Sequence, residues 1–147
     1  MTPEEKNDLH YVCSLVEFLS RKLHVRHRDL ANAITPTVFH RWMEDAAVNH
    51  CLSFDEVADT AIAQLHLQNG DYDVSTGCRY KIPSVEDIGA LYQQLIQAVQ
   101  KKDSLYSTFK AVFSSFIPKK ISNFNSLYMI GFIHFLSLGL PGLYFAS

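Results

Sequence analysis

The stretch "TPEEKNDLHYVCSLVEFLSRKL" (residues 2–23) carries the clearest signal for the fold. Thr2 can cap a helix, Pro3 suits the first helical position, and Glu5 completes a capping box with Thr2. Apolar residues then recur every three or four positions along one face: Leu9, Val12, Val16, Leu19 and Leu23. We therefore expect an amphipathic, core-facing helix over residues 3–23.

Further helical patterns follow this segment. Residues 26–50 predict two short helices separated at Thr35-Pro36, because the residue before proline disfavours helical geometry. Ser53 and Glu56 form a second capping box. Amphipathic patterns predict three more helices, within residues 52–70, 83–100 and 103–116. The sequence therefore predicts a mostly α fold, a compact bundle of five or six helices.

The segment "NGDYDVSTGCRY" (residues 69–80) has the composition of a binding loop. An EF-hand that starts at Asp71 would need glycine at its sixth position and glutamate at its twelfth, where this chain has Thr76 and Ile82. No glycine-rich phosphate-binding motif is present either. We interpret the segment as a structural connection, an irregular or short β-hairpin insertion near residues 71–82.

The C-terminal residues 121–147 contain no Asp, Glu, Lys or Arg, so we divide the chain into a helical domain (1–120) and an apolar segment (121–147). Residues 127–145 are long enough to cross a hydrocarbon core of roughly 30 Å, although Pro141-Gly142 interrupts them. A membrane anchor and a terminus altered from its ancestral sequence stay open. We favour packing on the domain or on an oligomer partner, through Phe132, Phe135, Leu138 and Leu143.

Composition limits the classes of function. A length of 147 residues allows one domain with a real core, and a net charge of −2 gives no global case for a nucleic-acid or anionic-membrane binder. The three cysteines form no CxxC pair, and the polar, acidic N-terminus is unlike a secretory signal. We expect reduced thiols in the cytoplasm, with membrane association through the C-terminus as the alternative.

No pattern of catalytic or metal-ligating residues stands out. Zinc needs four converging ligands, whereas His24 and His27 lie across a predicted helix end and His50 and Cys51 are adjacent and point apart. Cys13 lies beside an apolar face and is interpreted as a small core residue. We therefore predict no cofactor, no metal site and no catalytic residue, and infer no small-molecule substrate.

The densest basic region lies in residues 21–41, and "DLANAI…TVFHRW" has some features of a helix-turn-helix. The link at Thr35-Pro36 is too short for the bacterial repressor type and lacks its glycine. A solvated basic surface is the preferred interpretation. Nucleic-acid contact through this degenerate region, residues 26–43, is the alternative, with these candidate residues: Arg26, Arg28, Thr37, His40 and Arg41.

These observations leave three hypotheses in order. The first is a non-catalytic α-helical module that works through protein contacts, as a regulatory or accessory bacterial protein with a protein partner or as a homo-oligomer. The second is a nucleic-acid-binding regulator that uses residues 26–43. The third is a protein tethered to a membrane by residues 127–145, and an enzymatic activity stays open without a reaction to name.

Overall fold

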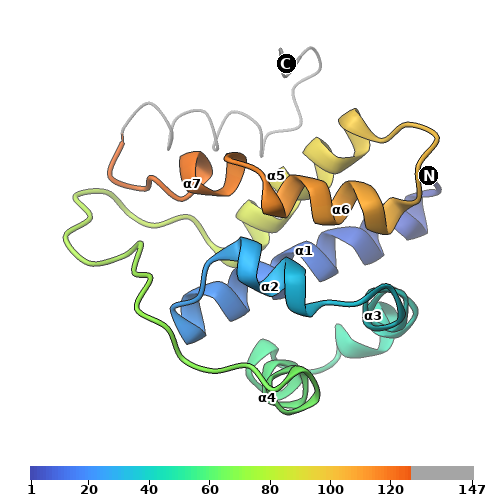
Figure 1. Cartoon of the computed structure of the whole chain (residues 1–147), viewed down its shortest axis with the longest axis horizontal. Helices are drawn as coiled ribbons and strands as arrows, with labels where there is room; N and C mark the ends of the chain where they lie inside the picture. The colour runs from blue at the N-terminus through green and yellow to red at the C-terminus, as the bar shows by residue number, and fades with distance from the viewer. Residues whose placement is uncertain (127–147) are drawn as a thin grey trace.

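The computed structural model describes residues 1–126, and this range contains seven α-helices and no β-strand (Figure 1). The helices are α1 (Pro3–Leu23), α2 (His27–Ala33), α3 (Pro36–Asn49), α4 (Phe54–Leu65), α5 (Val85–Val99), α6 (Leu105–Ser114) and α7 (Ile117–Ile121). The predicted all-α class is confirmed, with more helices than the five or six expected. The extra one is α7, which follows a break at the extended residue Ser115.

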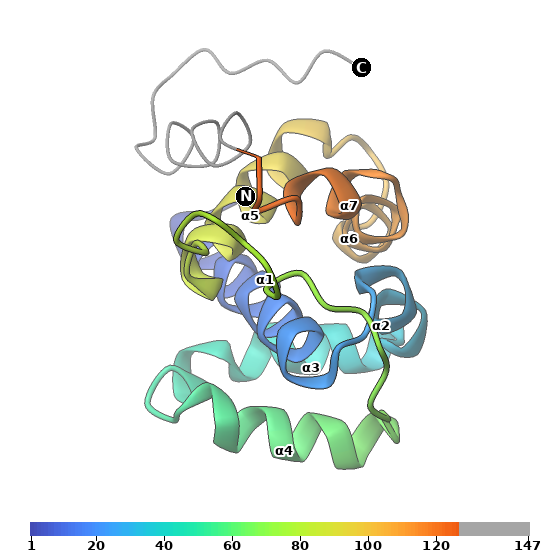
Figure 2. The same ribbon diagram turned by 90° about the vertical axis from the view of Figure 1, so that its left-hand side faces the viewer.

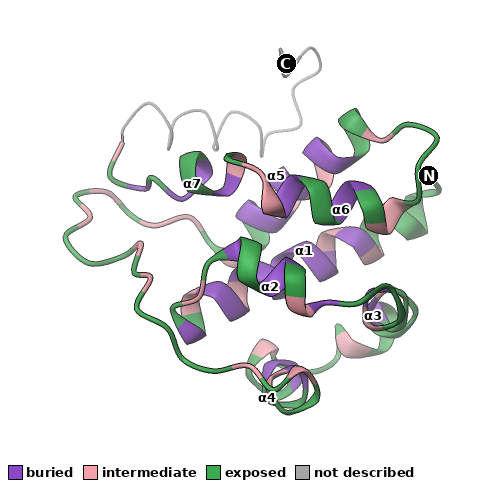
Figure 3. Cartoon of the chain, viewed as in Figure 1, coloured by how far each residue is buried: buried purple, intermediate pink, exposed green. Residues whose placement is uncertain are grey.

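Helix α1 lies at the centre of the molecule, with α3 and α4 on one side and α5, α6 and α7 on the other (Figures 1 and 2). Every residue from Tyr11 to Glu17 is buried, so the middle of α1 is enclosed on all faces. The sequence pattern predicted a helix with only one buried face. Figure 3 shows this contrast between the buried residues of α1 and the largely exposed connection that follows α4.

Both predicted capping boxes are present. Thr2 N donates to Glu5 Oε2 at 2.7 Å while Glu5 N donates to Thr2 Oγ1 at 3.1 Å, and Ser53 and Glu56 make the same reciprocal pair. Helix α4 ends at Leu65, earlier than the Asn69-Gly70 signal predicted, because the next residue adopts the left-handed conformation and closes the helix.

The predicted β-hairpin near residues 71–82 is wrong, since this segment contains no strand. Its backbone bonds to the end of α1: Gly70 N donates to Leu23 O at 2.8 Å and Tyr72 N donates to His24 O at 2.9 Å. Asp73 then accepts hydrogen bonds within its own turn, mainly from Thr76 and Ser75, and these bonds lower the pKa of its carboxyl. The segment is an irregular connection tied to α1.

Helices α1 and α5 share the most extensive helix contact of the described fold. Gly89 lies directly over α1, and a Cβ added to it would sit 2.8 Å from both the N and the Cα of Ser14. His10 Nε2 adds a hydrogen-bond contact to Glu86 O at 2.8 Å. Glycine is therefore required here because the two backbones touch.

A row of buried aromatic rings links α5, α6 and α3. Tyr92 lies 4.4 Å from Phe113, Phe113 lies 5.0 Å from Phe109, and Phe109 lies 4.7 Å from Phe39, as ring centroid distances. Tilted and edge-on aromatic contacts of this kind add to the stabilisation from burial alone. The row holds α6 against the helices on both sides of α1.

The core extends slightly past the predicted end of the helical domain at residue 120. Ile121 and Phe124 are buried, so at least the first part of the segment 121–147 packs on the helices. No helix within residues 1–126 has the length and apolarity needed to cross a membrane. The proposed anchor (127–145) and the proposed interface residues Phe132, Phe135, Leu138 and Leu143 lie outside the described residues.

Replacing Gly89 with alanine tests the α1–α5 crossing. We expect Gly89→Ala to lower the free energy of unfolding by about 1 to 3 kcal/mol, because the added methyl group forces the backbones apart. Urea unfolding followed by circular dichroism measures the change. Gln97→Ala, on the exposed side of the same helix, is the control. A Gly89→Ala protein stabilised by alanine's higher helix propensity would contradict the close crossing.

Candidate functional site

A buried ionic cluster joins α1 to α2. Glu17 and His27 are only 1% and 2% exposed, and Glu17 Oε1 lies 2.9 Å from His27 Nε2. The second carboxylate oxygen, Oε2, accepts from Arg21 Nε at 3.2 Å. Sequence reasoning missed this cluster, although an acid in the middle of the apolar run "CSLVEFLS" was a usable signal.

The surroundings of Glu17 decide its charge. Burial alone would raise the pKa of this carboxyl, but the charges and hydrogen bonds of His27 and Arg21 outweigh burial and lower it. The His27 ring also stacks on Phe113 with a centroid distance of 6.0 Å and lies 5.9 Å from the Tyr92 ring. Both oxygens of Glu17 are engaged, so the cluster is suited to fixing the start of α2.

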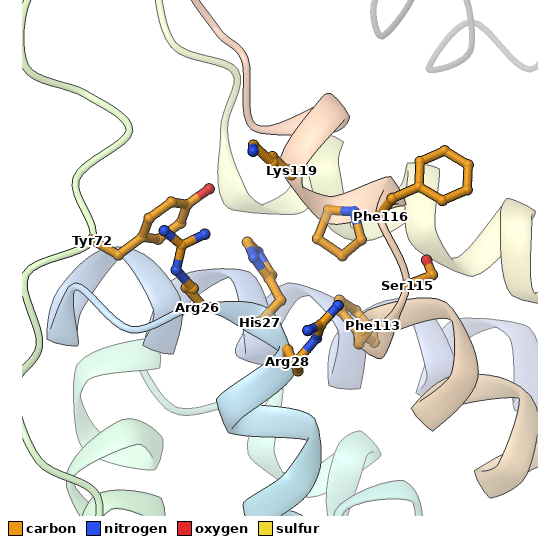
Figure 4. A pocket seen from close by; sticks show the side chains of 9 residues that line it. Arg26, His27, Arg28, Tyr72, Phe113, Ser115, Phe116 and Lys119 are labelled. Atoms are coloured by element: carbon orange, nitrogen blue, oxygen red, sulfur yellow. The ribbon is translucent and has the colours of Figure 1, made fainter.

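His27 also lines a surface pocket of about 360 Å³, which we call the basic hollow (Figure 4). Its walls come from the start of α2, from the connection after α4, and from the end of α6 and the start of α7. The lining residues are Arg26, His27, Arg28, Tyr72, Phe113, Ser115, Phe116, Pro118 and Lys119. Three of them are cationic and none is acidic, so the hollow is suited to an anionic group.

Contacts with the protein hold two of the cations of the basic hollow. The Arg26 guanidinium stacks over the Tyr72 ring, with Cζ 4.7 Å from the ring centroid. Arg28 Nε donates to Ser114 O, the last carbonyl of α6, at 3.2 Å. Within residues 1–126 neither Arg26, Arg28 nor Lys119 makes an ion pair with a carboxylate. Their charges therefore remain unneutralised at this surface.

The structure divides the residues predicted for nucleic-acid contact into two groups. Arg26 and Arg28 line the basic hollow, whereas Thr37, His40 and Arg41 are exposed on α3. Arg41 lines a different pocket, between α3 and α4. Contact with nucleic acid stays a prediction for all five residues.

The histidines and cysteines singled out by the sequence do not form a metal-binding group within residues 1–126. His24 is the exposed C-cap of α1 while His27 is buried, and residues 1–126 hold no group of three His, Cys, Asp or Glu side chains placed to bind a metal ion. Cys13 is fully buried, and burial raises the pKa of its thiol. A buried thiol of raised pKa is a poor nucleophile.

No protein-family model, no curated protein and no solved structure matches this chain.

Removing the charge of Glu17 tests the buried cluster. We expect Glu17→Gln to cost about 3 to 5 kcal/mol of unfolding free energy at neutral pH, because Arg21 loses its buried counter-charge and His27 loses its charged hydrogen-bond partner. Exposed Glu44→Gln is the matched control.

The Glu17→Gln variant also tests how the stability of the fold depends on pH. The pKa of Glu17 in the folded chain lies below its ordinary value of 4.5, so its stabilisation is present above that value and is lost as the pH falls through the lower folded value. The stability difference between the wild type and Glu17→Gln should therefore shrink in acid. Thermal unfolding from neutral pH down to about pH 3 measures it. A difference that stays constant would contradict an ionised, paired Glu17.

Proposed function

We propose that the chain is a non-catalytic protein-interaction module that binds an acidic segment of a partner protein at the basic hollow. The observation that carries the proposal is the set of cations Arg26, Arg28 and Lys119 in a hollow that no acidic side chain lines. Residues 127–147 contain no Asp or Glu that could neutralise them. A partner's carboxylates or other anions would supply the missing counter-charge.

An apolar contact beside the cations favours a peptide as the ligand. Phe116 lines the hollow, yet 67% of its surface is exposed, which is unusual for a phenylalanine. Aromatic and arginine side chains contribute strongly to protein interfaces when a partner covers them. An acidic segment with an adjacent apolar residue would cover both the charges and this ring.

The state of the ionisable groups supports a role in binding more than in catalysis. Glu17 and His27 are engaged with each other in the interior, and Cys13 is buried with a raised pKa. A catalytic acid, base or nucleophile must reach the reacting atoms.

Nucleic-acid binding is the second candidate. Arg26 and Arg28 can contact phosphates of either kind of partner. On α3, however, Glu44 and Asp45 follow Arg41 within about one turn, and their charges repel a phosphate backbone. Binding of a DNA duplex that weakens with salt and with Arg41→Gln would favour this candidate over the first.

The compartment and the oligomeric state are part of the proposal. Cys13, Cys51 and Cys78 are all free thiols, which supports the reducing cytoplasm. Association with a second copy or with a membrane would involve residues 127–147, and light scattering of the full chain with and without detergent separates the two.

A peptide array tests the proposed function. The full chain is applied to anionic peptides, both Asp/Glu-rich and phosphorylated, and to neutral and basic peptides of equal length. We expect binding to anionic peptides only, weakening as salt is added because the contact is electrostatic. Arg26→Gln/Lys119→Gln should remove most of it, because this double variant takes two charges from the basic hollow.

The control is Arg41→Gln/Lys110→Gln, which removes two exposed charges that do not line the hollow. It should bind as the wild type does. Circular dichroism checks that both double variants stay folded. Binding that is equal in the two double variants, or absent for every anionic peptide, would contradict the proposed function.

A further inference from the structure

We propose that the anion taken by the basic hollow is an aryl phosphate, presented as a phosphotyrosine side chain of the partner. This inference rests on the proposed function and specifies its ligand. It follows from three properties of the hollow: the number and type of its cations, the way they are held, and the aromatic groups beside them.

The cations suit phosphate better than a carboxylate. Arg26, Arg28 and Lys119 supply three positive charges with no carboxylate partner within residues 1–126. A phosphorylated side chain carries a charge of about −1.5 to −2 and three acceptor oxygens, whereas a carboxylate carries a single charge and two oxygens. Clusters of arginine forks are a recurrent means of binding phosphorylated peptides. A single carboxylate would leave most of the positive charge of the hollow unneutralised.

The two arginines are also held in place before any ligand binds. Arg26 rests on the Tyr72 ring, and Arg28 is fixed through Nε to Ser114 O. Figure 4 shows both side chains beside His27, with Lys119 on the opposite wall. The contact of Arg28 uses Nε, so the terminal nitrogens of its guanidinium remain as donors for a ligand. Side chains held in this way lose less conformational entropy when an anion binds.

The remaining lining points to an aromatic arm next to the phosphate. Four ring-bearing residues line this hollow of about 360 Å³, which is larger than a phosphate group needs: Tyr72, Phe113, Phe116 and Pro118. Phe113 and Pro118 are buried, so the rings that a ligand can reach are half-buried Tyr72 and the 67% exposed Phe116 at the rim. The phenyl ring of phosphotyrosine can pack against Tyr72 or Phe116 at the edge of the hollow while its phosphate meets the cations. A phosphoserine has no ring to place there, and Phe116 would stay exposed.

Fluorescence anisotropy with the full chain tests the inference. The probes are four dye-labelled peptides with identical Gly/Ser flanks and a central phosphotyrosine, phosphoserine, glutamate or tyrosine. We expect phosphotyrosine to bind about tenfold more tightly than phosphoserine or glutamate, and tyrosine not to bind. Arg28→Gln and Phe116→Ala should each weaken the phosphotyrosine peptide at least severalfold, while the control Arg41→Gln should not.

Competition identifies the source of the ligand. Phenyl phosphate should displace the phosphotyrosine peptide at lower concentration than inorganic phosphate does, because only phenyl phosphate contacts the ring walls. Adenosine monophosphate should compete no better than inorganic phosphate. If it competes better than phenyl phosphate, the ligand is a nucleotide and the phosphotyrosine inference is overturned.

The other outcomes separate the two proposals. Equal binding of the glutamate and phosphotyrosine peptides would overturn the phosphate inference and leave the proposed function standing. Equal binding of the phosphoserine and phosphotyrosine peptides would overturn the inference that the hollow recognises the aromatic ring attached to the phosphate. Absence of binding to all anionic peptides, in a chain whose circular dichroism is that of a folded helical protein, would overturn both proposals.

Discussion

The contact between the backbones of α1 and α5 is the constraint on which the rest of the structure depends. Since Gly89 lets α5 lie directly on Ser14, α1 is enclosed along its middle, and buried polar side chains there need partners inside the protein. Ser14 Oγ donates to His10 O and Ser20 Oγ donates to Val25 O. The enclosure of α1 is also what removes Glu17 from water and makes its pairing with His27 and Arg21 obligatory.

That pairing connects the core to the surface. Helix α2 has seven residues and no side-chain cap, so its own hydrogen bonds hold it weakly. His27, its first residue, is fixed from below by Glu17 and from the side by Phe113. The residues on either side of His27 are Arg26 and Arg28, so the buried pair also determines where these two cations stand. The buried Glu17–His27 contact and the basic hollow are parts of one arrangement.

Local signals in the sequence predicted the helices well and the site poorly. The Thr2–Glu5 capping box gave the start of α1 because all its bonds lie within one turn. The hairpin was wrong because the segment near residue 72 bonds to α1, which no local pattern records. The sequence pattern places Arg26 and Arg28 in one basic region with Arg41. In the fold these two arginines line a pocket with Lys119, which comes from the far end of the described chain. Contacts of such long range depend on how helices pack, which residue spacing does not contain.

The attachment of the connection after α4 has a consequence for how the surface can vary. Its two bonds to α1 join main-chain atoms, Gly70 N to Leu23 O and Tyr72 N to His24 O, so the path of the chain there does not depend on the side chain at position 72. Tyr72 can therefore be exchanged without rebuilding the scaffold. At this wall the path of the backbone and the side chain shown to solvent are therefore set by different atoms, and single substitutions at position 72 can change the surface chemistry of the hollow while the backbone keeps its course.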